Sequence, residues 1–100
     1  MVQATTPTFV MTLPGSVDPG DFAHMYFSLV QNTVNIRKDD ADITVDGQTV
    51  SATLSQADTV RLIPGDAKIQ LNWTYPNGSR ACSQIVVIHI TENLLKEVVE

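Results

Sequence analysis

Apolar and polar residues alternate with a period of two along most of the chain, which is the pattern of β-strands that bury one face. The clearest example is 67–75, where every odd-numbered position is apolar or aromatic and every even-numbered position is polar. Similar runs predict further strands at 8–13, 23–31, 33–37, 43–45, 48–54 and 80–90. Turn-forming residues separate these runs at short intervals. The pattern predicts an all-β, antiparallel β-sandwich of about seven strands.

Three connections between these strands carry local signals. Asp46-Gly47 is a two-residue sequence favoured in type I′ hairpins, because both central positions accept a positive φ. Pro76-Asn77-Gly78 predicts a type I turn closed by a glycine bulge, so that 69–90 forms one β-hairpin. Ser55 followed by Asp58 is a capping-box pattern, which predicts a single helical turn that crosses between the sheets.

The end of the chain carries more apolar residues than one face of a small sheet requires. Residues 85–90 read IVVIHI, so this strand is expected to be central in the domain or covered on its outer face. Thr91 is a candidate N-cap for a short helix at about 92–99. Its apolar side is formed by Leu94, Leu95, Val98 and Val99. This side packs on the domain's own sheet, docks onto a neighbour, or does both.

Length and charge narrow the possible classes of function. One hundred residues form a single domain, 1–100, that is long enough to bury a core. The chain has 11 acidic and 6 basic residues and a net charge of -5, which offers no basic surface to nucleic acid or to an anionic membrane. It also lacks a signal-peptide pattern and an apolar run of about 18 residues. We therefore expect neither export through a signal peptide nor membrane insertion.

Cys82 and the two histidines are the side chains that first suggest chemistry. His24 and His89 lie on predicted strands without further metal ligands at suitable spacing, whereas a structural zinc site needs about four ligands. We expect both to be solvent-facing or hydrogen-bonded strand residues. The single Cys82 cannot form an intrachain disulfide, and it is expected to be a reduced, buried thiol of a protein made in a reducing cytoplasm. A nucleophilic role would require a base and an orienting group from elsewhere in the fold.

One acidic cluster is a candidate metal site, and it consists of Asp39, Asp40, Asp42 and Asp46. Oxygen-rich loops bind calcium, but the ligand order and the distal Glu of an EF-hand are absent here. We expect a solvated turn, with calcium binding as the alternative. Paired carboxylates, a Gly-rich phosphate loop and a Ser/His/Asp order are missing from the sequence, so we expect no enzyme activity and no cofactor.

Short features at strand ends and turns occur along nearly the whole chain in the order found in one group of proteins. They are Thr6-Pro7-Thr8, Leu13-Pro14, Gln31, Leu54 to Thr59, Ile69-Gln70, Asn77-Gly78, Ala81 with Ser83, and Asn93-Leu94-Leu95. With these features the chain resembles small β-sandwich virion proteins encoded in phages and prophages of Firmicutes. It is similar to the N-terminal domain of the upper-baseplate proteins of siphophages, although Ala57 stands near a position where similar sequences usually have Glu.

The resemblance implies an immunoglobulin-like sandwich that serves, in several copies, as a building block of a tail tip or other virion part. It carries no catalytic residues. We therefore expect a non-enzymatic virion component that binds other virion proteins or forms a homo-oligomer, mainly through Leu94, Leu95, Val98 and Val99 and less firmly through the outward face of the last strand. One alternative is a carbohydrate- or cell-surface-binding module, although Tyr26 and Tyr75 are few and far apart in the sequence. Another is an accessory domain of a cellular enzyme.

Overall fold

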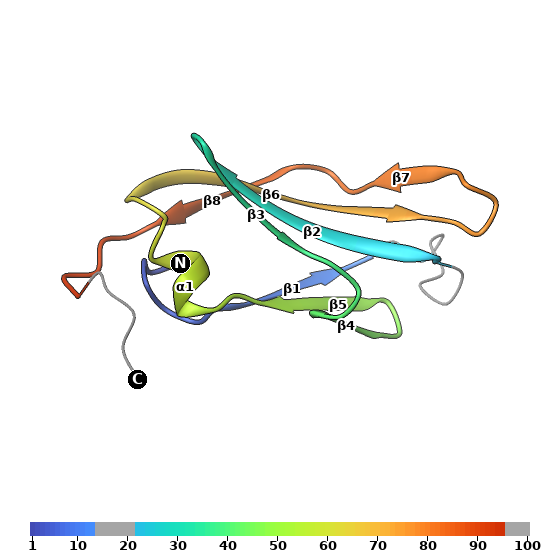
Figure 1. Ribbon diagram of the computed structural model, residues 1–100, viewed down its shortest axis with the longest axis horizontal. Coiled ribbons are helices and arrows are strands. Elements are labelled where there is room, and N and C mark those ends of the chain that lie inside the picture. Colours follow the sequence, from blue (N-terminus) through green and yellow to red (C-terminus); the bar gives the residue numbers. More distant parts are fainter. Residues whose placement is uncertain (14–21, 96–100) are drawn as a thin grey trace.

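Two antiparallel sheets pack face to face in the computed structural model, which describes residues 1–13 and 22–95 (Figure 1). The smaller sheet has the order β1 (Thr8–Thr12), β5 (Thr49–Thr53) and β4 (Ile43–Asp46). The larger sheet has the order β3 (Val34–Lys38), β2 (His24–Gln31) and β6 (Gly65–Thr74), followed by β7 (Arg80–Cys82) and β8 (Val86–Ile90), which pair with different parts of β6. The expected all-β, antiparallel sandwich is confirmed.

The order of the strands gives this sandwich a particular topology. The β2 strand lies in the larger sheet between β3 and β6, and it pairs with both in antiparallel register. In an immunoglobulin constant domain the first and second strands lie in the same sheet, whereas here β1 and β2 lie in different sheets. Sandwiches of this architecture do not always share one topology. The molecule is longest in the direction of its strands, and its overall extents are 45 × 26 × 21 Å.

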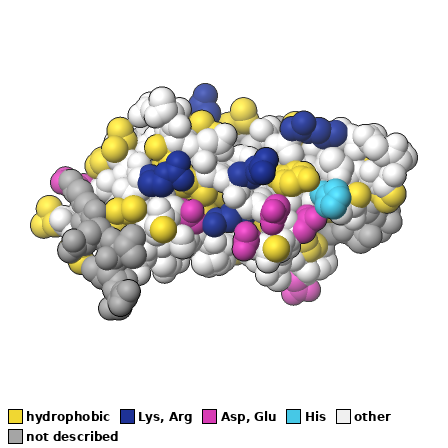
Figure 2. All heavy atoms as spheres, in the orientation of Figure 1, with side chains coloured by type: hydrophobic (Ala, Val, Ile, Leu, Met, Phe, Trp, Pro, Cys, Tyr) yellow, Lys and Arg dark blue, Asp and Glu magenta, His cyan; other side chains and the backbone are white. Residues whose placement is uncertain are grey.

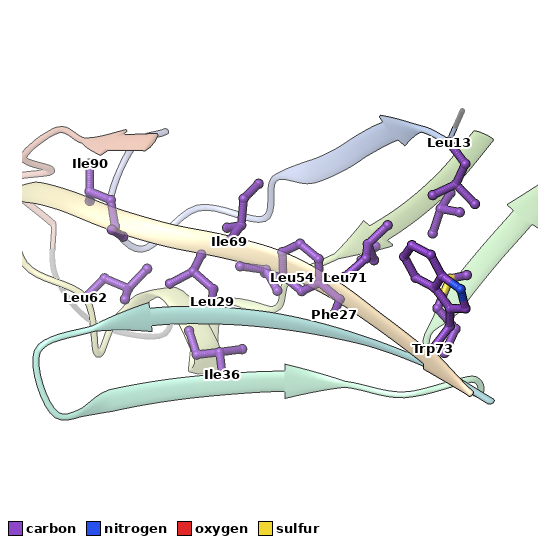
Figure 3. Packing of buried hydrophobic residues seen from close by; sticks show 14 residues of the cluster. Leu13, Phe27, Leu29, Ile36, Leu54, Leu62, Ile69, Leu71, Trp73 and Ile90 are labelled. Atoms are coloured by element: carbon purple, nitrogen blue, oxygen red, sulfur yellow. The ribbon is translucent and has the colours of Figure 1, made fainter. Parts of the chain in front are cut away.

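The core lies between the two sheets and is built from the inward side of each alternating strand. Figure 3 shows these side chains from β2 and β6 pointing into the space between the layers, with Trp73 beside Leu13 at one end and Ile90 and Leu62 at the other. Phe27 and Leu71 are fully buried, and Trp73 is 4% exposed. The prediction that the single tryptophan is a core residue is therefore confirmed.

Two hairpin turns follow the local chemistry of the sequence, one of them in a different form from that expected. Gly78 has φ +87° and its N–H donates to the Tyr75 carbonyl, as expected for a type I turn closed by a glycine bulge. In the other hairpin Asp46 pairs with Thr49, so the loop is 47–48. Only Gly47 in this loop has a positive φ, which is the type II′ pattern instead of the expected type I′ pattern.

A single helical turn, α1 (Gln56–Thr59), carries the chain from the small sheet to the large sheet. The Ser55 hydroxyl accepts from the Asp58 N–H at 3.2 Å, and the Asp58 carboxylate accepts from the Ser55 N–H at 3.0 Å. The expected capping box is therefore confirmed. Asp58 also pairs with Lys38 Nζ at 2.8 Å, which ties α1 to the end of β3.

Buried polar side chains fasten the segments that lie outside the sheets. The Gln31 amide donates to the Ile63 carbonyl at 2.7 Å, and its oxygen accepts from the Ile63 N–H at 2.9 Å. The Gln3 amide donates to the Leu62 carbonyl, and Gln3 is only 4% exposed. These bonds satisfy backbone groups that no strand reaches, and they hold the connection before β6 in place.

The C-terminal helix expected at 92–99 does not form in its first half. Residues 92–95 have no helical structure, and 96–99 lie outside the described residues. The Asn93 amide donates to the Gln3 carbonyl at 2.9 Å, while its oxygen accepts from the Leu95 N–H at 3.1 Å. Such local side-chain bonds compete with a helix. Over 92–95 the prediction is wrong because Asn93 anchors the chain to the N-terminal segment.

Candidate interaction surface

The β8 strand lies at the edge of the larger sheet, where three consecutive apolar side chains are exposed. Ile85, Val86 and Val87 are 57%, 47% and 59% exposed. The strand pairs with β6 alone, and it is therefore neither central nor covered within the described part of the chain. The alternation along β8 explains the two-sided pattern of the sequence, because Val86 faces inward with Ile69 and Val87 faces outward with Lys68.

The N-terminal segment covers only one end of this edge. The Met1 ammonium group donates to the His89 carbonyl at 2.9 Å, and the Thr91 N–H donates to the Met1 carbonyl at 2.8 Å. In an antiparallel ladder, alternate residues point their N–H and C=O groups to the same side. The backbone groups of Val87 therefore point to the same free side as those of His89, but no strand among the described residues lies beside Val87.

A hollow runs between this edge and the free edge of the smaller sheet. Its volume is about 480 Å³, and its lining includes Met11 and Leu13 on one side, Leu71 and Trp73 at its base, and Val86 on the other side. The Val86 side chain faces inward but remains 47% exposed because the hollow is open there. The two sheets therefore meet loosely along the β1 and β8 side, and apolar surface is accessible at this seam.

The apolar residues expected to bind a partner are exposed as far as the structure describes them. Leu94 is 92% exposed and Leu95 is 51% exposed, so neither packs into the domain's core. Val98 and Val99 lie outside the described residues. The surface around both sheets otherwise mixes isolated yellow apolar patches with polar side chains in the view of Figure 2.

The expectation that Cys82 is a buried thiol is wrong, because its side chain is exposed. The register of β7 with β6 places Ala81 opposite the buried Trp73 and Cys82 opposite Asn72. Residues directly opposite each other in a sheet share a face. Cys82 therefore lies on the outer face of the larger sheet. The apolar character of the second hairpin arm suggested burial, but the arm lies at the edge of the sheet and one of its faces is exposed to solvent.

The two histidines each contact one aspartate on the surface. His24 Nδ1 lies 2.7 Å from Asp40 Oδ2, and His89 Nδ1 lies 3.3 Å from Asp66 Oδ1. The hydrogen bond from His24, together with one from the Met25 N–H, lowers the pKa of the Asp40 carboxyl below its ordinary value. Hydrogen-bonded strand histidines are therefore confirmed.

The acidic cluster does not converge on one point. Asp40 turns toward His24, whereas the Asp39 carboxylate accepts from the Ala41 N–H at 3.2 Å within its own turn. Asp42 and Asp46 are both exposed. Across residues 1–13 and 22–95, no three His, Cys, Asp or Glu side chains come together in a way that could hold a metal ion.

A polar hollow that the sequence did not reveal lies on the outer face of the larger sheet. Tyr26, Arg37, Asn72 and Arg80 line it, and its volume is about 340 Å³. Arg37 and Arg80 are 43 positions apart in the sequence (80 minus 37). Only the order β3, β2, β6, β7 brings them to one face, so no motif or spacing in the sequence could have identified the group.

Comparison of this chain with protein families, with curated proteins and with solved structures gives no match. Among the helices of the described residues, none is long and apolar enough to cross a membrane.

Proposed function

We propose that the chain is a non-enzymatic structural module that assembles with a second copy of itself through the free edge of β8. The observation that carries this proposal is the exposed apolar run 85–87 at a sheet edge. Natural proteins usually protect an edge strand with charges, proline or a covering segment, because an open edge pairs with other strands. Residues 85–88 contain neither a charge nor proline.

The neutrality of the edge supports a second copy as the occupant. Although the chain has a net charge of -5, residues 81–91 contain no Lys, Arg, Asp or Glu. A two-fold antiparallel pairing centred near Val86 therefore juxtaposes no like charges. It places Val87 of one copy opposite Ile85 of the other, and it joins the two larger sheets into one. The N-terminal segment, which lies beside 89–91, limits the pairing to the open stretch.

We further propose that this module is part of a virion. This proposal rests on the resemblance to small phage and prophage virion proteins. A domain that adds its sheet to a neighbour's sheet suits a repeated building block of a tail or baseplate. Mass spectrometry of purified particles tests this step, since the chain should be present in them in several copies. Its absence from the particles would leave an assembling domain without a virion role.

The self-assembly step is tested by measuring mass in solution with light scattering after size-exclusion chromatography. We expect the wild-type mass to approach twice the chain mass of 10.9 kDa as concentration rises. Val87→Pro removes the N–H that the partner needs, and it leaves the bonds between β8 and β6 in place. We expect this variant to remain a folded monomer.

Two matched controls separate edge pairing from general stickiness. Val87→Thr retains the N–H and the branched shape, so it should still dimerise. Val30→Lys removes another exposed valine, 38% exposed, from the outer face of the central β2 strand, and it should also dimerise. A wild-type chain that stays monomeric at every concentration, or a dimer that survives in Val87→Pro, would refute the proposal.

A further inference from the structure

The polar hollow on the outer face of the larger sheet has the chemistry of a binding site. Its polar side chains come from four neighbouring strands, and they are Arg37, Tyr26, Ser28, Asn72, Thr74 and Arg80. Its volume of about 340 Å³ falls in the range of roughly 300–1,000 Å³ typical of small-molecule sites. The hollow lies on the face opposite the core, and its lining shares no residue with the apolar seam except Trp73.

Tyr26 is one of the residues that line this hollow, and its ring lies near the Arg37 guanidinium group and 6.5 Å from the His24 ring, measured between ring centroids. The Arg37 guanidinium carbon lies 5.9 Å from the centroid of the Tyr26 ring. Asn72 is the cross-strand neighbour of Tyr26, and its oxygen accepts from Arg80 Nη2 at 3.0 Å. The hydrogen bond orients Arg80 and uses only one of the five N–H donors that an arginine carries. The hollow thus combines the aromatic ring of Tyr26, two arginine side chains and several hydroxyl or amide groups.

Among residues 1–13 and 22–95, neither Arg37 nor Arg80 forms an ion pair with a carboxylate. Within the part of the chain that the structure describes, the ion pairs involve other residues, and they are His24–Asp40, Lys38–Asp58 and His89–Asp66. The described residues that line the hollow include no Asp or Glu, although 11 of the 100 residues of the chain are acidic. The local charge is therefore opposite in sign to the net charge of the chain.

We infer that this hollow binds an acidic saccharide, that is, a hydroxylated ring that carries a carboxylate or phosphate group. Guanidinium groups recognise both of these anions through paired N–H donors. The apolar face of the sugar ring packs on Tyr26, and its hydroxyl groups bond to Asn72, Ser28 and Thr74. A long polyanion such as nucleic acid fits poorly, because the two arginines form a local site on an acidic molecule.

The site is tested by nuclear magnetic resonance titration of the uniformly ¹⁵N-labelled full chain. The acidic probes are trigalacturonate, which carries carboxylates, and a glycerol phosphate oligomer, which carries phosphates. The neutral probe is the methyl ester of trigalacturonate. We expect saturable shifts at Tyr26, Asn72 and Arg80 with one or both acidic probes and none with the ester. The two acidic arms distinguish which anion the site prefers.

Substitutions then separate the site from charge attraction alone. Arg80→Gln and Tyr26→Ala should each weaken binding by about tenfold, the equivalent of about 1.4 kcal/mol. Lys68→Gln is the matched control, because it removes one positive charge from the same face outside the hollow. It should change affinity less than twofold. Dispersed amide spectra confirm that each variant is folded.

Several outcomes would overturn the inference. It fails if no acidic probe causes saturable shifts at millimolar concentration, or if Lys68→Gln weakens binding as much as Arg80→Gln. Equal binding of polyglutamate would show attraction to any polyanion instead of a saccharide site. The inference is independent of self-assembly, since Val87→Pro should still bind the acidic probe as a monomer. Loss of one property therefore leaves the other to be judged separately.

Discussion

At the scale of single residues, the direction in which a side chain points decides its role more than its chemical type. Cys82 and Ala81 are neighbours in a short strand, and both are compatible with a core. The register with β6 turns Ala81 inward beside Trp73 and turns Cys82 outward beside Asn72. The thiol therefore meets solvent although the sequence around it is apolar.

The exposure of Cys82 predicts its reactivity in the native state. With the disulfide reagent 5,5′-dithiobis(2-nitrobenzoate), we expect one equivalent of thiol to react without denaturant, because the side chain is accessible. The absorbance of the released thiolate measures the reaction, and a Cys82→Ser variant gives the background. A thiol that reacts only after denaturation would show that Cys82 is covered in solution.

At the scale of elements, the segments that the sequence predicted well are those in which neighbouring residues favour a single local structure. The Ser55 and Asp58 capping box, the glycine at 78 and the alternation of β6 each specify a structure from a few adjacent residues. Residues 92–95 differ, because their conformation depends on a residue that is distant in the sequence. Gln3 offers Asn93 a partner 90 positions away, and no local signal encodes that bond.

The capping box makes a prediction about stability and pH. Burial alone would raise the pKa of Asp58, but hydrogen bonds from Lys38 and Ser55 outweigh it and lower the pKa below the ordinary value of 3.8. A lowered pKa in the folded state means that the ionised carboxylate stabilises the fold. This contribution is fully present above the ordinary pKa, and it is lost as pH falls through the lowered folded value.

Asp58→Ala should therefore reduce the free energy of unfolding by about 1 kcal/mol at neutral pH, the usual effect of losing a capping interaction. The difference from wild type should shrink in acid, where both chains lack the charge. Urea unfolding followed by tryptophan fluorescence at several pH values measures it. Asp42→Asn, at an exposed turn position, is the matched control and should change little. An equal loss in both variants would mean that the capping box contributes nothing specific.

At the scale of the whole molecule, the edges and outer faces of the sheets carry the proposed functions, and these features depend on strand order. The alternation in the sequence was sufficient to predict two antiparallel sheets, because each strand must bury one face. It could not place β8 at an edge or bring Arg37 and Arg80 to one face, since both depend on which strands pair. The apolar IVVIHI run was visible in the sequence, but only the pairing with β6 shows that 85–87 is open to a partner.

The exposed leucines near the C-terminus provide the last prediction about assembly. Leu94 and Leu95 make no contribution to the core, so Leu94→Lys combined with Leu95→Lys should leave the thermal midpoint unchanged within about 2 °C, as expected for exposed positions. If these leucines bind a partner as the sequence suggests, the double variant should dissociate the assembly at concentrations where the wild type remains associated. Sedimentation velocity measures the dissociation of the double variant and of Val87→Pro under the same conditions.

The comparison of these variants identifies which surface holds the copies together. Dissociation by Val87→Pro alone assigns the contact to the β8 edge and contradicts a role for the two leucines in this assembly. Dissociation by both variants indicates one contact that extends from the edge to the C-terminal segment. Truncation after Asn93 is the sharper version of the leucine test, because it removes both leucines and retains the bond from the Asn93 amide to the Gln3 carbonyl. A truncated chain that unfolds would instead show that the C-terminal segment stabilises the domain itself.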